Sequence, residues 1–86
     1  MERGRLSWNA RPLRVLEAVA RLGSVAAAAA ELGYTQSAAS QQLAALERET
    51  GLTLVDRGAR PLRLTEAGAT VLRHGRDVLA GFVAME

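Results

Sequence analysis

The sequence predicts a mainly α-helical fold, a winged helix-turn-helix of three helices and a two-stranded wing that is followed by a long linker helix. Three segments of helical periodicity end at Gly23, Gly33 and Gly51, and hydroxyl residues restart the second and third. Two short alternating segments then flank a turn that contains glycine and proline, as in a β-hairpin. A final segment keeps helical spacing to the end of the chain.

Composition restricts the possible functions. The 86 residues suffice for one small domain and leave little room for an enclosed substrate pocket, so we do not expect an enzyme. Because the chain has no cysteine and a single histidine, His74, we expect no disulfide, metal site or cofactor. No segment has the apolar run of a signal peptide or the roughly 18 apolar residues of a membrane span, which predicts a cytoplasmic protein without a membrane partner.

The basic residues are all arginine, 11 in number, within a net charge of +2. A guanidinium group donates two parallel hydrogen bonds to a phosphate or to guanine, which favours a nucleic-acid partner. A chain rich in arginine and alanine also arises from a GC-rich genome, so composition leaves both explanations open.

The first helix is expected to begin at Asn9 as its N-cap, to tolerate Pro12 in its first turn and to end at Leu22. Its apolar positions recur at helical spacing: Leu13, Leu16, Val19 and Ala20. Ser24 is expected to cap a second helix over residues 25–32. The alanines of that helix have high helix propensity and allow another helix to approach closely.

Only Gly33 and Tyr34 separate this helix from a third one, which Thr35 is expected to cap and which runs to about Thr50. A short turn with glycine between two helices is typical of a helix-turn-helix, here over about residues 25–44. At about 100° per residue the third helix has two faces. The core-like face carries Ala39, Leu43, Leu46 and Thr50. The other face carries Gln36, Ser37, Ser40, Gln41 and Ala44.

The second of these faces suits a DNA major groove. Glutamine pairs with adenine through two hydrogen bonds, and serine reaches either a base or a phosphate. The start of the helix, with its unpaired N–H groups and the Thr35 hydroxyl, favours a phosphate oxygen. Glu47 and Glu49 come late in the helix and are expected to lie away from the groove. Periodicity alone leaves open that this is an ordinary solvated face.

The wing is expected over about residues 52–64, with strands at 52–55 and 62–64. It carries three arginines within seven positions, and Asp56 is its only close acid in the sequence: Arg57, Arg60 and Arg63. Arginines on a hairpin tip suit backbone phosphate or a narrow minor groove, although a solubilising turn would also carry them.

Thr65 is expected to cap the last helix, which has an apolar stripe made by Val71, Leu72, Val78, Leu79 and Phe82. Because the stripe continues toward Glu86, the chain is expected either to be a piece of a longer protein or to need a partner that covers the stripe. His74 lies between arginines and on a different helix from the serines, so we expect a surface residue there and no catalytic site.

The combined motifs resemble the N-terminal DNA-binding domain of LysR-type transcriptional regulators. The segment TQSAASQQL at residues 35–43 resembles the recognition helix of that family. The remaining matches follow in register, at residues 13–20, 23–24, 28–32, 46–47, 51–52, 54–57 and 63–68. The resemblance covers about residues 8–80. It implies a winged helix-turn-helix domain over residues 8–65 and a linker helix for dimerisation over residues 66–86.

This resemblance implies a bacterial, nucleoid-associated transcription factor that binds a palindromic promoter site as a homodimer. It also implies tetramers in full-length members and a C-terminal domain that binds a small-molecule inducer, which is absent from these residues. Gln41 lies where the family often has arginine, which removes one phosphate or guanine contact. Val25 and Val55 replace usual phenylalanines.

Sequence-specific binding of double-stranded DNA is therefore the expected function. The expected DNA contacts are Thr35, Gln36, Ser37, Ser40, Gln41, Arg57, Arg60 and Arg63. The expected dimer contacts are Leu72, Val78, Leu79 and Phe82. The alternative is a winged-helix module that dimerises or docks a protein without binding DNA.

Overall fold

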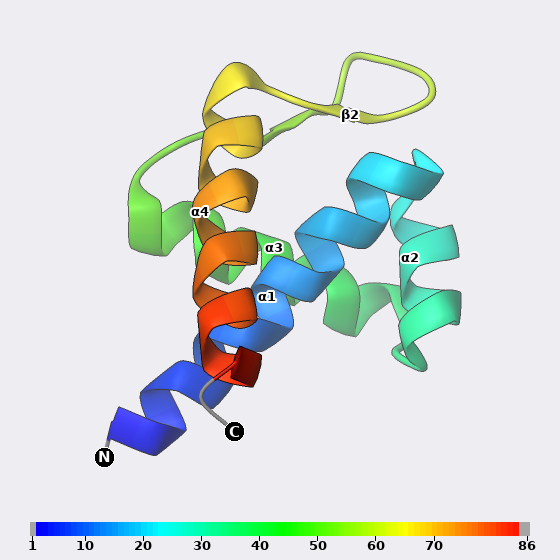
Figure 1. The fold of residues 1–86 in the computed structure, drawn as a ribbon. Coiled ribbons are helices and arrows are strands. Elements are labelled where there is room, and N and C mark those ends of the chain that lie inside the picture. Colours follow the sequence, from blue (N-terminus) through cyan, green and yellow to red (C-terminus); the bar gives the residue numbers. More distant parts are fainter. Residues whose placement is uncertain (1, 85–86) are drawn as a thin grey trace.

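Helices dominate the structure, a computed structural model that describes the backbone of residues 2–84 and the side chains of residues 11–75. In chain order its elements are α1 (Glu2–Leu22), α2 (Val25–Leu32), α3 (Gln36–Thr50), β1 (Val55–Asp56), β2 (Arg63–Leu64) and α4 (Glu66–Ala84). This order confirms the predicted fold of three helices, a two-stranded wing and a final helix (Figure 1).

The helix α1 lies at the centre and packs against the other three helices. In Figure 1 it crosses the molecule between α2 and α4, with α3 behind it. The wing lies near the C-terminal end of α1, where β2 contacts both α1 and α4. The core collects buried apolar side chains from all four helices and from the start of the wing: Leu13, Val15, Leu16, Ala18, Val19, Ala28, Ala29, Ala39, Leu43, Leu46, Leu54, Val55 and Leu72.

The start of α1 differs from the prediction. The helix begins at Glu2, so Asn9 lies inside it and is not its N-cap, and Pro12 is an interior residue. A proline inside a helix lacks the N–H that would bond to the preceding turn, but the ring of Pro12 is fully buried and adds apolar contacts that offset this loss. Ala20, expected on the apolar face, is exposed, whereas Val15 and Ala18 are buried.

The boundaries of α2 and α3 confirm the predicted capping residues. The Ser24 hydroxyl accepts a hydrogen bond from the Ala27 N–H at 3.1 Å, and the Thr35 hydroxyl accepts one from the Ala38 N–H at 3.0 Å. Each cap satisfies an N–H that the first turn of a helix leaves without a partner. The two helices are therefore joined by a turn of two residues and a cap, as a helix-turn-helix requires.

The wing is shorter than predicted. The strands β1 and β2 pair antiparallel with Val55 opposite Leu64 and Asp56 opposite Arg63. Residues 52–54 are not part of the ladder, because their backbone groups bond elsewhere. The Leu54 N–H donates to the Glu47 carboxylate at 2.8 Å, and the Leu54 carbonyl accepts from the Thr65 N–H at 3.0 Å.

Both ends of the wing are held by neighbouring helices. At one end the Leu62 N–H donates to the Gly23 carbonyl at 2.9 Å, just after α1. Gly23 has φ +76°, and a Cβ atom there would lie 2.6 Å from the Pro61 Cβ, so only glycine fits this junction. At the other end the Thr65 hydroxyl accepts from the Gly68 N–H at 3.0 Å, as predicted for the cap of α4, and donates to the Thr53 carbonyl at 2.6 Å.

The first turns of α4 belong to the core of the domain. Leu72 is buried against α1 and its neighbours, with 6% of its surface exposed, so the dimer contact predicted for it is taken by its own chain. Periodicity put Leu72 on the same stripe as the later residues but could not show that α1 covers the early part of that stripe. The side chains of Val78, Leu79 and Phe82 lie outside the described residues.

We predict that Gly68→Ala destabilises the domain. An alanine Cβ at this position would lie 2.1 Å from the Leu54 carbonyl oxygen, so α4 would have to move away from the wing. We expect a loss of about 1–3 kcal/mol in the free energy of unfolding, despite the better helix propensity of alanine. Urea unfolding followed by circular dichroism measures this change.

The matched control is Gly58→Ala, where the added Cβ would meet only the Asp56 carboxylate, at 3.5 Å. The control is expected to unfold within about 0.5 kcal/mol of the wild-type chain. Equal stabilities of the two variants would contradict the close packing of α4 on the wing.

Candidate nucleic-acid interface

The polar face of α3 is open to solvent. All five residues predicted to contact DNA from this region are exposed: Thr35, Gln36, Ser37, Ser40 and Gln41. On the opposite side Ala39, Leu43 and Leu46 are buried in the core. The two predicted faces are therefore confirmed with two exceptions: Ala44, predicted on the open face, is half-buried, and Thr50, predicted on the core face, is exposed. The Thr50 hydroxyl donates to the Leu46 carbonyl at 2.9 Å. An exposed helix face with amide and hydroxyl groups is free to meet a flat or grooved partner.

The start of α3 and the wing lie on the same side of the molecule. Gln36 and Arg60 line one open hollow of about 280 Å³, together with residues 23–26 and Leu62. Residues 23–26 lead into α2, so both helices of the helix-turn-helix reach this hollow. The structure thus brings together a predicted base-contacting residue and a predicted backbone-contacting arginine, which lie 24 positions apart in the sequence.

A larger hollow of about 600 Å³ lies between the end of α1 and the returning arm of the wing. Arg21 of α1 and the wing residues Arg60 and Arg63 line it. Arg60 donates from Nη1 to the carbonyls of Arg57 at 2.7 Å and Ala59 at 2.8 Å, which holds its side chain along the loop. Arg63 is 77% exposed, and its Nε lies 3.8 Å from a carboxylate oxygen of Asp56 on the paired strand. Such an exposed ion pair is weak, which leaves the Arg63 guanidinium able to bind another anion.

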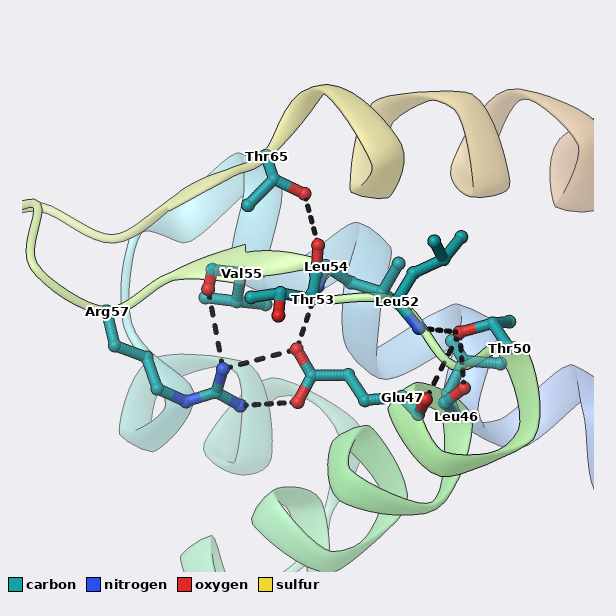
Figure 2. A network of polar contacts seen from close by, with 9 residues as sticks. All are labelled: Leu46, Glu47, Thr50, Leu52, Thr53, Leu54, Val55, Arg57 and Thr65. Carbon is teal, nitrogen blue, oxygen red and sulfur yellow. Dashed lines mark hydrogen bonds and ion pairs between the residues drawn. The ribbon is translucent and has the colours of Figure 1, made fainter.

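Arg57 differs from the other wing arginines. Its guanidinium binds the Glu47 carboxylate of α3 through two hydrogen bonds, Nη2 to Oε1 at 3.2 Å and Nη1 to Oε2 at 3.2 Å (Figure 2). Asp56 is the close acid in the sequence, but the fold brings a second acid, Glu47, against Arg57. The contact joins residues that lie ten positions apart across the turn after α3, so no local pattern in the sequence predicts it.

The Glu47 carboxylate also binds the backbone of the wing. Its Oε2 accepts from the Leu54 N–H at 2.8 Å, and 19% of the Glu47 side chain is exposed. Burial alone raises the pKa of Glu47, but the Leu54 N–H and the Arg57 guanidinium stabilise the charged form and bring its pKa below the ordinary value of 4.5. Glu47 is therefore an ionised link between α3 and the wing.

A second set of charges joins α1 to α2. The Arg21 guanidinium donates to the Glu17 carboxylate on its own helix at 3.1 Å and also forms an ion pair with Glu31 on α2. The hydrogen bonds that Arg21 donates to Glu31 and Glu17 raise the pKa of Arg21, and the bond that Glu31 accepts from Arg21 lowers the pKa of Glu31. The i,i+4 spacing of Glu17 and Arg21 is a sequence signal for the first contact, whereas the second depends on how the helices pack.

Within the part of the chain that the structure describes, acidic and histidine side chains form no group of three that could hold a metal ion. Among the same residues, no helix is both long enough and apolar enough to cross a membrane.

Residues 10–69 match the model of a family described as bacterial regulatory helix-turn-helix proteins of the lysR family. The chain belongs to the LysR family. The matched segment runs from α1 to the first turn of α4 and so contains the helix-turn-helix and the wing.

Curated relatives agree with this assignment. An uncharacterised HTH-type transcriptional regulator of Sinorhizobium fredii is 48% identical over 65 residues, which are 76% of this chain and 22% of the relative. The RuBisCO operon transcriptional regulator of Allochromatium vinosum is 45% identical over 76 residues, which are 88% of this chain and 25% of the relative. The chain thus spans a quarter or less of the length of these LysR-family relatives.

Solved LysR-family structures have the same fold. The DNA-binding domain of BenM, solved in complex with benA site 1 DNA, has a TM-score of 0.82 at 33% identity, over 88% of this chain and 85% of that one. Vibrio fischeri DarR in complex with DNA has a TM-score of 0.83 at 28% identity, over 87% of this chain and 26% of that one.

We predict that the domain loses stability in acid through Glu47. Because its folded-state pKa lies below its unfolded value, the carboxylate contributes stability above about pH 4.5, and this contribution is lost as the pH falls through the folded-state pKa. Glu47→Gln should be less stable than the wild-type chain near pH 7, and the difference should shrink toward about pH 3. Urea midpoints across this pH range provide the measurement.

Glu49→Gln serves as the control, since Glu49 is an exposed residue of the same helix. Its urea midpoints should follow those of the wild-type chain at every pH. A stability gap between Glu47→Gln and wild type that stays constant with pH would argue against an ionised Glu47 link.

Proposed function

We propose that this chain binds double-stranded DNA with sequence preference and acts in transcriptional regulation. The observation that carries this proposal is the common placement of Gln36 and Arg60 on one hollow, beside an exposed face of α3 that carries no acid in its first turns. A helix with short polar side chains fits the major groove, while an adjacent arginine-bearing hairpin reaches the backbone or the minor groove.

The roles within this interface follow from the chemistry of each side chain. Gln36, Ser40 and Gln41 read base edges through amide and hydroxyl groups, and Ser37 and Thr35 contact phosphates at the start of α3. Arg60 and Arg63 contact the backbone or the minor groove from the wing. The BenM DNA-binding domain, similar in fold and 33% identical, was solved in complex with DNA, which supports DNA binding by this chain through analogy.

The proposed DNA-binding form is a homodimer. The spacing of Val78, Leu79 and Phe82 on α4 gives an apolar stripe that a second copy would cover, so that two copies of α3 meet the two halves of a palindromic site. We propose a tetramer only for a full-length form of the protein, and a small-molecule inducer only if a C-terminal domain exists.

We predict different effects for two substitutions at the interface. Arg60→Ala should weaken binding to all DNA sequences about equally and reduce the slope of log affinity against log salt by about 1. Gln36→Ala should cost roughly 1–3 kcal/mol on the preferred site only. Fluorescence anisotropy on the preferred site and on a scrambled duplex measures both effects, with exposed Arg73→Ala on α4 as the control. Uniform losses by both interface variants would contradict the separate roles.

The preferred site itself comes from selection of bound duplexes out of a random pool, followed by titration at low and moderate salt. We expect enrichment of an inverted repeat and binding that weakens steeply with salt. The substitution of glutamine for arginine at position 41 favours a second candidate, a winged helix that dimerises or docks a protein. Failure of a verified dimer to bind any duplex in a salt-sensitive manner would establish that second candidate over the first.

We predict that Phe82→Asp shifts the chain from dimer to monomer, because a carboxylate would have to be buried in an apolar contact. Sedimentation velocity at several concentrations measures the change. Arg73→Asp, which alters charge on an exposed part of the same helix, should leave the dimer intact. A dimer that survives Phe82→Asp unchanged would show that the contact lies elsewhere.

A further inference from the structure

We propose that Glu47 and Arg57 form a positioning pair that sets the place of the wing relative to α3, and that Arg57 acts on DNA binding through Glu47 rather than as a phosphate contact. This inference rests on the proposed function, DNA binding, and names the residues that align its two contact elements.

The pair joins the two elements directly. Glu47 lies in the last turns of α3, and Arg57 follows β1. Both carboxylate oxygens of Glu47 are used, one by Arg57 Nη2 at 3.2 Å and the other by Arg57 Nη1 at 3.2 Å and the Leu54 N–H at 2.8 Å. A two-point contact between a planar guanidinium and a carboxylate fixes orientation as well as distance. The wing therefore cannot turn about α3 without breaking these bonds (Figure 2).

The link continues to a second arginine of the wing, Arg60. The carbonyl of Arg57 accepts from Arg60 Nη1 at 2.7 Å, and Arg60 shares a hollow with Gln36 at the start of α3. Hydrogen bonds thus lead from the end of α3 through Glu47 and Arg57 to Arg60. A shift of the loop at Arg57 would move Arg60 relative to Gln36.

The charge of Arg57 is already matched. The Arg57 side chain is 53% exposed, but its guanidinium is bonded to both carboxylate oxygens of Glu47, whose side chain is 19% exposed. An ionised carboxylate with so little exposure would lose its main counter-charge if Arg57 turned to a phosphate, and that loss opposes such a turn. A neutralised pair also releases few counterions, so it adds little to the salt dependence of binding.

Positioning and direct contact predict opposite effects for Glu47→Gln. If Arg57 binds phosphate, removing the competing negative charge frees its guanidinium and tightens binding to the polyanion. If the pair positions the wing, the same change loosens the wing and weakens binding. The sign of the effect therefore separates the two roles.

The experiment uses the 86-residue chain and a fluorescein-labelled duplex of mixed sequence, about 30 base pairs or roughly three helical turns long. Affinities are measured by anisotropy at several salt concentrations for Glu47→Gln, Arg57→Gln and the double variant. We expect each single variant to bind the duplex about tenfold more weakly than the wild-type chain, and the double variant to bind no more weakly than either single variant. The dependence of log affinity on log salt should stay that of the wild-type chain. The proposal would be overturned if Glu47→Gln bound DNA more tightly and Arg57→Gln reduced the slope of log affinity against log salt by about 1.

Arg57→Lys provides a milder variant should the others unfold. Lysine keeps the positive charge but cannot bond both carboxylate oxygens in one plane. The positioning role predicts weaker binding for this variant, whereas a phosphate contact predicts nearly unchanged binding, because lysine binds phosphate as a point charge. Glu49→Gln, on the exposed side of α3, is the matched control and should not weaken binding. Thermal unfolding of every variant confirms that each is folded at the assay temperature.

Hydrogen exchange at the Leu54 N–H tests the pair without DNA. The Leu54 amide hydrogen should exchange faster in Glu47→Gln and in Arg57→Lys than in the wild-type chain. An unchanged exchange rate in both variants would overturn the proposed link. If the wild-type chain shows no salt-sensitive binding to the duplex, the proposed function is wrong. The inferred effect of the Glu47–Arg57 pair on DNA binding is then wrong as well. The exchange result then still decides whether the pair holds the wing.

Discussion

One carboxylate, that of Glu47, connects the helix α3 to the wing. It accepts hydrogen bonds from the Leu54 N–H of the wing backbone and from the guanidinium of Arg57. The β-ladder spans only two residues on each strand, so its few hydrogen bonds do not determine where the hairpin points. The orientation of the wing depends instead on three attachments, to α3 through Glu47, to α1 through Gly23 and to α4 through Thr65. Those attachments hold the wing on the same side of the molecule as the start of α3, the other proposed DNA-contacting element.

Features with a local physical cause were predictable from the sequence. Ser24 and Thr35 cap helices because their hydroxyls reach N–H groups three residues ahead, and this is a property of a few adjacent residues. The two faces of α3 follow in the same way from helical spacing, since a residue on the buried side recurs every three or four positions. The helix-turn-helix and the exposed polar face are therefore predictable from the sequence alone.

Features that depend on packing between distant segments could not be predicted from the sequence. In the sequence, Glu47 does not differ from any other acid near the end of a helix, and only the fold brings the wing against it. Leu72 has the spacing of a dimer stripe, and only the fold places it in the core of its own chain. The early start of α1 was missed because Asn9 and Pro12 together resemble a helix start, although proline also occurs inside a helix when its ring is buried. In each case the deciding contact lies many residues away or on another element.

The burial of Leu72 bears on where this module can be cut or fused. Its side chain belongs to the same core as Leu13 and Leu16, so the globular unit extends past the wing and includes the opening turns of α4. A chain shortened at the end of the wing would leave a cavity beside α1 and expose its apolar surface. Because the same helix continues without a break beyond this buried part, anything joined to its distal half is connected to the core of the domain by continuous helix.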